Sequence, residues 1–431
     1  MVKYSLTIAL LLAVSVLFAK DGVEKTKNIH ENFAVDANSW LEVKSSDATV
    51  DIQTWDQNKV DISIDIIVRA EDEALAKEFL DAALPSISGG SGKVSVDLTM
   101  CGMAWEKKNG SSKVKINGGK WIKIIDFKII AHIKIPRDGN LDLNASYGKA
   151  EFGDLRGSVK ICGYDGQVKG GSIGGKAEIK MTYGTLTLGK LSTVQSLKLY
   201  ESTVTFANLP ACTLVSHYSK ISGGQAGDLV LDSYEDKLTF ESTGKLNGKL
   251  TYSTFDSGTI KDANLHLYET KLTAGNIGNL ALESHYSRLN IGKCASLNAE
   301  KCYEDVINIG ELGALNGKGQ YCHFTIDRLT GNVTYMGFED KFSIKAVGSS
   351  VKRVEIGGQY LQAQITLDRN MAYELEVDAQ YPSLSFPKAD FKSSVDAKSD
   401  KVKFALRDHV AGKANTILIF TGYEVNVVIA H

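Results

Sequence analysis

The sequence predicts an all-β protein, a single right-handed parallel β-solenoid with one N-terminal helix and rungs of about 17 to 18 residues. Three observations support this fold class. A tyrosine recurs every 16 to 19 residues through the middle of the chain, and apolar residues alternate with polar ones between successive tyrosines. The 431 residues also include 40 glycines but only 5 prolines, as expected for many tight turns between hydrogen-bonded strands.

The repeat takes two alternating forms, a tyrosine followed by a small residue and a tyrosine followed by an acid. When the tyrosine of the first form is aligned with the acid of the second, every step is 17 or 18 residues. A column of this kind marks a corner that recurs once per rung. The predicted corner ladder is Tyr147, Asp165, Tyr183, Glu201, Tyr218, Glu235, Tyr252, Glu269, Tyr286, Glu304, Tyr321 and Glu339.

Each corner lies between two short runs of alternating apolar residues. Leu197 and Leu199 precede Glu201, and Val204 and Phe206 follow it. Period-two alternation is typical of strands that bury one face. A repeat this short cannot bury its apolar face alone, so successive rungs must stack, with equivalent residues about 4.8 Å apart. The right-handed winding is expected from the chirality of parallel crossover connections.

The chain divides into four parts. Residues 1–19 carry a lysine, an apolar run and a final alanine, which predicts a signal peptide and export to the periplasm, outer surface or medium. Residues 20–140 are expected to form a β-rich cap region, 141–345 the regular solenoid and 346–431 less regular rungs of the same continuous solenoid. Within the cap region, acids, helical spacing and a following proline predict a helix at 70–84. We expect this helix to help cover the N-terminal end, because an open solenoid end promotes edge-to-edge association.

The composition restricts the function classes. A net charge of −2 gives no reason to expect a nucleic-acid partner, and no segment after the signal resembles a transmembrane span. The six cysteines show neither Cys-x-x-Cys pairs nor zinc-finger spacing. Small buried thiols are the favoured interpretation of these cysteines, with Cys302–Cys322 as the one disulfide worth testing.

Candidate chemistry concentrates at the corners. Acids recur only on alternate rungs, about 9.6 Å apart, which is too far for a retaining pair of carboxylates and near the limit for an inverting pair. We therefore expect no catalytic residues, and we expect no metal or cofactor. The tyrosines of the acidic rungs are expected to face outward as a row that could bind a glycan or a surface protein. This candidate binding face is Tyr164, Tyr200, Tyr234, Tyr268 and Tyr303.

The rungs resemble a family of exported bacterial β-solenoids named "putative adhesin", related to the auto-transporter adhesin head-like domain. The resemblance rests on Ile135-Pro136 followed by Tyr147-Gly148, and on the Ser-His-Tyr-Ser rungs at 216–219 and 284–287. It covers most of residues 30–430. These motifs are structural, so the resemblance implies the fold and an adhesion role by analogy, with no catalytic residues to carry over.

Two functions are compatible with these features. The first is an exported, non-enzymatic, adhesin-like binding or scaffold protein. The alternative is a carbohydrate-active enzyme, a polysaccharide lyase or hydrolase, on a parallel β-helix. A cleft with convergent acids of raised pKa would favour the enzyme, whereas a smooth rod with evenly spaced corner residues would favour the binding protein.

Overall fold

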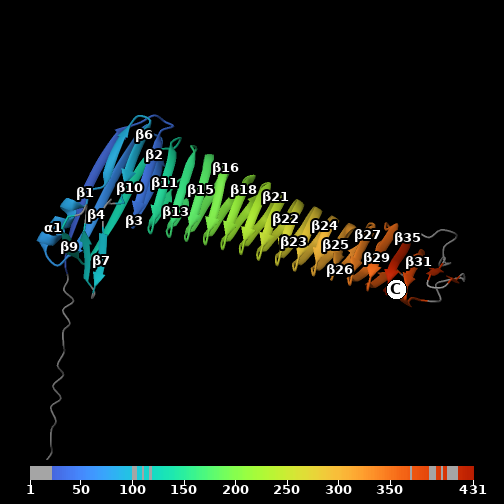
Figure 1. Cartoon of the computed structure of the whole chain (residues 1–431). Coiled ribbons are helices and arrows are strands. Elements are labelled where there is room, and N and C mark those ends of the chain that lie inside the picture. The colour runs from blue at the N-terminus through green and yellow to red at the C-terminus, as the bar shows by residue number, and fades with distance from the viewer. Residues whose placement is uncertain are drawn as a thin grey trace, which may run out of the picture.

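The protein is a rod of stacked rungs with an enlarged N-terminal end (Figure 1). The computed structural model describes residues 22–99, 104–108, 111–115, 119–368, 371–387, 395–398, 401–404 and 416–431. It is 75% strand and 3% helix, with about 13 turns of about 18 residues each. The predicted β-solenoid is therefore confirmed, while the signal peptide at 1–19 lies outside the described residues.

Each rung has one strand before the corner and one strand after it. Strands that end at the corner form one face of the rod, here called the leading face, and strands that begin after it form the trailing face. The leading face contains β6 (Lys93–Asp97), β2 (Trp40–Ser46), β11 (Asn140–Ser146), β13 (Val159–Tyr164), β15 (Ile173–Thr182), β18 (Cys212–His217), β20 (Leu229–Tyr234), β27 (Val333–Phe338), β29 (Arg353–Gln359), β35 (Thr416–Tyr423) and β31 (Tyr373–Gln380).

The trailing face continues the stack on the other side of the corner. It contains β1 (Val23–Ala34), β4 (Lys59–Ala70), β10 (Asp126–Pro136), β3 (Ala48–Trp55), β12 (Lys149–Phe152), β14 (Gln167–Gly170), β17 (Thr203–Leu209), β19 (Lys220–Ala226), β26 (His323–Leu329), β28 (Lys341–Val347), β30 (Gln362–Leu367), β36 (Asn426–Ala430) and β32 (Ser383–Ser385). Longer strands run from the trailing face into the leading face of the next rung, namely β16 (Thr185–Tyr200), β21 (Lys237–Thr251), β22 (Thr254–Tyr268), β23 (Lys271–His285), β24 (Arg288–Tyr303) and β25 (Val306–Gln320).

The core runs along the inside of the rod. Leu197, Leu199, Val204 and Phe206, which alternate with polar residues in the sequence, are at most 4% exposed. Burial of each such side chain stabilises the fold by about 1.5–3 kcal/mol. Because parallel rungs stack in register, as β21 does on β22, this contribution repeats along the rod.

The stack begins before residue 141. Strands β2 and β3 pair in parallel with β11 and β12, and Asp47 occupies their corner with a φ of 54°. The intervening residues build the N-terminal end. There β10 pairs with β3, then β4 and β1 add antiparallel strands. Strand β5 (Ser86–Gly90) extends the leading face, and β7 (Ala104–Lys108), β8 (Ser111–Lys115) and β9 (Trp121–Ile124) form a separate small sheet.

The predicted helix at 70–84 is confirmed as α1 (Glu73–Ala82). Asp72 caps its first turn by accepting a hydrogen bond from the Leu75 backbone N–H, which satisfies one of the free donors there. The helix packs on β1, β4 and β9 at the N-terminal end of the rod (Figure 1). Phe79 is fully buried, with its ring 5.6 Å from that of Phe127, so the expected position of the helix is also confirmed.

The C-terminal rungs do not stack in chain order, unlike the continuous progression expected from the sequence. Strand β35 lies between β29 and β31, and β36 lies between β30 and β32. The last rung of the sequence is therefore the last but one in space. At the C-terminal end of the rod, β34 (Lys401–Phe404) pairs antiparallel with β31, and β33 (Val395–Lys398) pairs antiparallel with β34.

The two corner forms explain this insertion. The corner residues of these rungs are Tyr360, Glu424 and Tyr381 in spatial order. Chain order would place Tyr360 beside Tyr381 and put two corners of the same form on adjacent rungs. Inserting β35–β36 between them restores the alternation of tyrosine and acid.

Engineered disulfides should report this order. Gln364 is the register partner of Val428, and Ser385 is also a register partner of Val428. In the double variant Gln364→Cys/Val428→Cys the two Cα atoms are one strand spacing apart, within disulfide reach. We expect this pair to cross-link on mild oxidation, as measured by peptide mapping without reduction.

The matched control is Gln364→Cys/Ser385→Cys. These positions are two strands apart in the observed order, about 9.6 Å, and should not cross-link. They would be adjacent if the rungs stacked in chain order. Cross-linking of the control pair but not of the first pair would contradict the inserted rung.

Candidate functional site

The corner of each rung has a left-handed backbone. All twelve residues of the predicted corner ladder have a φ between 44° and 60°. This conformation costs roughly 1–2 kcal/mol for a residue other than glycine. The corner N–H nevertheless stays paired, because Tyr218 donates to the Tyr234 carbonyl of the next rung and Glu235 donates to the Thr251 carbonyl.

The aromatic rings of both corner forms meet in one continuous stack, here called the aromatic ladder. Adjacent rings have centroids 5.4–5.8 Å apart and planes inclined by 76–90°. Edge-to-face pairs of this kind contribute about 0.5–1.5 kcal/mol each beyond the area that they bury, which offsets the backbone strain. In spatial order the aromatic ladder is Tyr147, Tyr164, Tyr183, Tyr200, Tyr218, Tyr234, Tyr252, Tyr268, Tyr286, Tyr303, Tyr321, Phe338, Tyr360, Tyr423 and Tyr381.

The five tyrosines of the candidate binding face supply every second ring in their part of this ladder. The sequence suggested a separate row one column away from the corner tyrosines, but the structure interleaves the two. Tyr164 is 41% exposed, whereas Tyr234 and Tyr303 are half-buried between their neighbours. The candidate face is thus half of a longer aromatic surface rather than a row by itself.

The corner carboxylates lie beside the rings and are exposed. Glu201 raises the pKa of Tyr200, first because it accepts a hydrogen bond from the phenol. Glu235 raises the pKa of Tyr234 in the same way. These two phenols therefore interact with the acid of their own rung and stay protonated at neutral pH.

A buried polar column follows the corner by one residue. The chain turns there, so the N–H of this residue needs an acceptor outside the strand ladder. Ser219 N–H donates to Asp236 Oδ1 of the next rung at 2.7 Å, and Asp236 N–H donates to Ser253 Oγ at 3.1 Å. At these two corners, a side chain of the next rung thus completes the backbone hydrogen bonding of the rung before it.

Three aspartates in this column are buried without a cation, a feature that the sequence reasoning missed. Asp236 is 4% exposed, and Asp305 and Asp340 are fully buried. Burial raises the pKa of Asp305 and of Asp340 to about 6 in each case. Asp305 accepts from Ser284 Oγ at 2.9 Å and Asp340 from Tyr335 Oη at 3.1 Å. The signal was a second acid directly after Glu235, Glu304 and Glu339.

The buried cysteines are free thiols. Cys302 and Cys322, the pair singled out for a disulfide, are both unbonded and at most 2% exposed. Burial raises the pKa of the Cys322 thiol to about 12 and raises that of Cys302 further. Thiols held protonated in this way are poor nucleophiles, in keeping with the favoured interpretation of small buried side chains.

A shallow groove of about 660 Å³ runs beside the aromatic ladder on the leading face. Gly319, Gly337 and Gly358 form its floor, and Phe338 and Met336 lie on opposite sides. The first two glycines make room for neighbours inside the rod, since a Cβ at Gly319 would lie 2.4 Å from Tyr335 Oη. Two rings of the ladder, Tyr303 and Phe338, line this groove.

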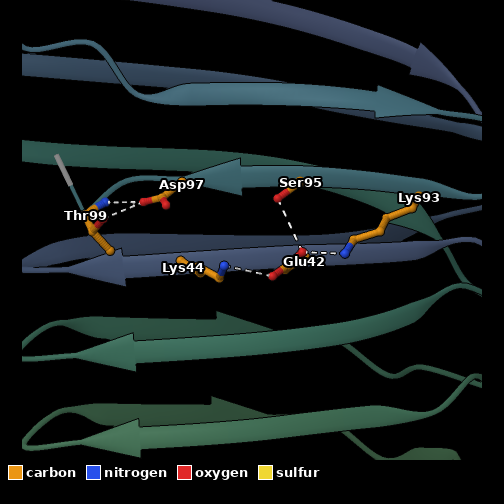
Figure 2. A network of polar contacts seen from close by, with 6 residues as sticks. All are labelled: Glu42, Lys44, Lys93, Ser95, Asp97 and Thr99. Carbon is orange, nitrogen blue, oxygen red and sulfur yellow. Dashed lines mark hydrogen bonds and ion pairs between the residues drawn. The ribbon is translucent and has the colours of Figure 1, made fainter. Parts of the chain in front are cut away.

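Other polar clusters have structural partners. On the leading face of the N-terminal end, Glu42 of β2 binds Lys93 at 2.6 Å and Lys44 at 3.1 Å, which ties β2 to β6 (Figure 2). The Lys93 and Lys44 amines lower the pKa of Glu42. Within the described residues, no group of three or more His, Cys, Asp or Glu side chains could hold a metal ion. No described helix has the length and hydrophobicity to cross a membrane.

Comparison with known proteins gives little beyond the structure. No family model matches the sequence, and no curated protein matches it. Among solved structures, the chain is similar to a "putative cell adhesion protein" from Clostridium sporogenes, with 8% identity over 94% of this chain and 99% of that chain. The TM-score is 0.17, so this likeness carries no argument, and the adhesin family remains a prediction.

Removal of a ladder ring should destabilise the rod. Tyr252 contacts the rings of Tyr234 and Tyr268, each at 5.6 Å. We expect Tyr252→Ala to lower the free energy of unfolding by about 1–3 kcal/mol, because two ring pairs are lost, and Tyr252→Phe to retain most of it. Urea denaturation measures both changes. Tyr381 ends the ladder with one ring neighbour, so an equal loss in Tyr381→Ala would show that ring pairing is not the cause.

The buried aspartates should make stability fall as pH rises. Asp305 and Asp340 bind a proton near pH 6 when folded but near pH 4 when unfolded. Between these values the folded state holds more protons, so the free energy of unfolding decreases as pH increases. We expect each carboxyl to add roughly 1 kcal/mol of stability on going from pH 7 to pH 5.

Thermal unfolding of an Asp305→Asn/Asp340→Asn variant between pH 5 and pH 7 tests this expectation. The amides should flatten the pH dependence, whereas Asp165→Asn, at an exposed corner, should leave it unchanged. An unaltered pH dependence in the double variant would contradict the assignment of these two groups.

Proposed function

We propose that the protein is an exported, non-enzymatic, adhesin-like binding or scaffold protein, and that the aromatic ladder is its binding surface. The observation that carries this proposal is the unbroken stack of rings along one edge of the rod. Monomeric proteins rarely expose a long apolar surface of this kind without a binding role. The partners that it favours are a glycan or a protein on another surface.

The geometry of the ladder suits an extended partner. Equivalent rings recur every second rung, about 9.6 Å apart, and adjacent rings are inclined by 76–90°. Ring faces and ring edges therefore alternate along the rod. A partner with its own repeat could contact many such positions at once, and many weak contacts then add up to high avidity.

The alternative, a carbohydrate-active enzyme, would need accessible acids of raised pKa. Asp305 and Asp340 have raised pKa values and lie two rungs apart, about 9.6 Å. Both are fully buried and accept hydrogen bonds from the protein, so a substrate could not reach them without opening the corner. We therefore favour binding without catalysis.

A glycan array and binding to bacterial or host cell surfaces test the proposal. We expect the wild type to bind a subset of glycans or surfaces. Tyr200→Ala and Tyr234→Ala should each lose affinity by roughly fivefold, because a ring contact contributes about 1 kcal/mol. Tyr200→Phe is the matched control and should bind nearly as well.

Two outcomes would contradict this function. If the alanine variants bind as tightly as the wild type, the aromatic ladder is not the binding surface. If any bound glycan is shortened on incubation, as measured by the release of reducing ends, then the protein is an enzyme and the non-enzymatic proposal fails.

A further inference from the structure

The groove beside the ladder differs from the rest of the leading face in its side chains. In the column next to the floor, rings alternate with hydrogen-bonding groups: His285, Tyr303, Gln320, Phe338 and Gln359 follow one another on successive rungs. Tyr303 and Phe338 are thus two rungs apart with the amide of Gln320 between them, and the amide of Gln359 follows Phe338. The amides can donate and accept hydrogen bonds while the rings offer apolar contact.

The opposite wall of the groove is basic. Lys301 and Lys318 lie on neighbouring rungs, and both are exposed. On some other rungs a lysine pairs with an acid on the adjacent rung, as Lys293 does with Glu311 at 2.8 Å. Neither groove lysine is within 4.0 Å of a carboxylate in the part of the chain that the structure describes.

The groove itself contains no negative charge. All of its lining residues belong to the described chain, and none of them is acidic. Glu283 is the register partner of Lys301 on the adjacent rung, but its carboxylate binds His266 at 3.1 Å and is not within 4.0 Å of the Lys301 amine. The amines of Lys301 and Lys318 therefore line an open, partly apolar groove that contains no carboxylate. An anionic ligand would relieve the repulsion between these two amines.

We propose that this groove binds a linear glycan that carries carboxylate groups, such as a polymer of uronic acids. Lys301 and Lys318 would bind carboxylates on one side of the chain. Tyr303 and Phe338 would contact sugar ring faces on the other side, with Gln320 between them bound to hydroxyls. This inference rests on the proposed binding function and names the class of ligand for one part of the rod.

The spacing of the groove fits this ligand. Rings two rungs apart are separated by about 9.6 Å, which is comparable to the length of a disaccharide unit in an extended glycan. The groove is open rather than enclosed and follows the stack of rungs across Tyr303, Gln320, Phe338 and Gln359. A polymer can therefore enter from the side and lie across the rungs of the groove.

Calorimetric titration of the full chain with hexagalacturonate tests the proposal. We expect binding that weakens as salt is raised from low to physiological concentration, and a loss of at least about tenfold in Lys301→Gln/Lys318→Gln, since two charged hydrogen bonds are removed. The matched control is Lys180→Gln/Lys198→Gln. Those lysines are register partners beside the ladder but outside the groove, and their removal should change affinity little.

The outcomes separate this inference from the proposed function. Equal losses in the two lysine pairs, or equally tight binding of a hexaglutamate peptide, would overturn the groove assignment in favour of diffuse charge attraction. Binding of neutral cellohexaose that depends on Tyr200 but not on Lys301 or Lys318 would overturn it too, yet leave the aromatic ladder as the binding surface. Loss of all binding only in the groove pair would support the inference.

Discussion

The structure depends on how the buried residue after each corner finds a hydrogen-bond partner for its backbone N–H. Each corner residue has a positive φ, and the residue after it turns an N–H into the rod. At six corners of the described chain, a serine or aspartate oxygen of the next rung accepts that N–H, as Asp236 does for Ser219 and Asp305 does for Ser287. Because an unsatisfied buried donor costs about 1–3 kcal/mol, each of these six rungs is complete only when the next one has been added.

This dependence accounts for the shape of both ends. A stack in which every rung needs its neighbour leaves unpaired groups at each end, and these would promote association. At the N-terminus the antiparallel strands β4 and β1 and the helix α1 replace a further rung, and ion pairs such as Lys25–Glu73 line the outer edge. At the C-terminus the rung β35–β36 is inserted before the final rung, so the outermost strands are ones that the chain had already laid down.

The fold could be predicted from the sequence because the repeat is a packing pattern. The column from Tyr147 to Glu339 contained the register, and the structure places every member at a positive φ. The direction of the side chains could not be obtained in this way. Tyrosines one column apart converge into a single stack only because the left-handed corner turns the Tyr183 ring back toward Tyr164 and Tyr200. The buried aspartates were missed because a carboxylate after Glu304 suggests a solvated turn unless the orphan N–H is known.

The repeated corner side chains and the irregular groove give different information about function. The corner ladder repeats on every rung, and its ring pairs also stabilise the rod because they offset the strain of the left-handed backbone. The class of ligand is better sought where the pattern of side chains departs from this repeat. In the groove, Lys301 and Lys318 form no ion pair among the described residues. The amides of Gln320 and Gln359 take positions beside the ladder that His217 and Thr251 hold on other rungs. The side chains of the groove therefore indicate the chemical class of the ligand better than the repeated tyrosines do. The tyrosines provide the apolar contacts beside it.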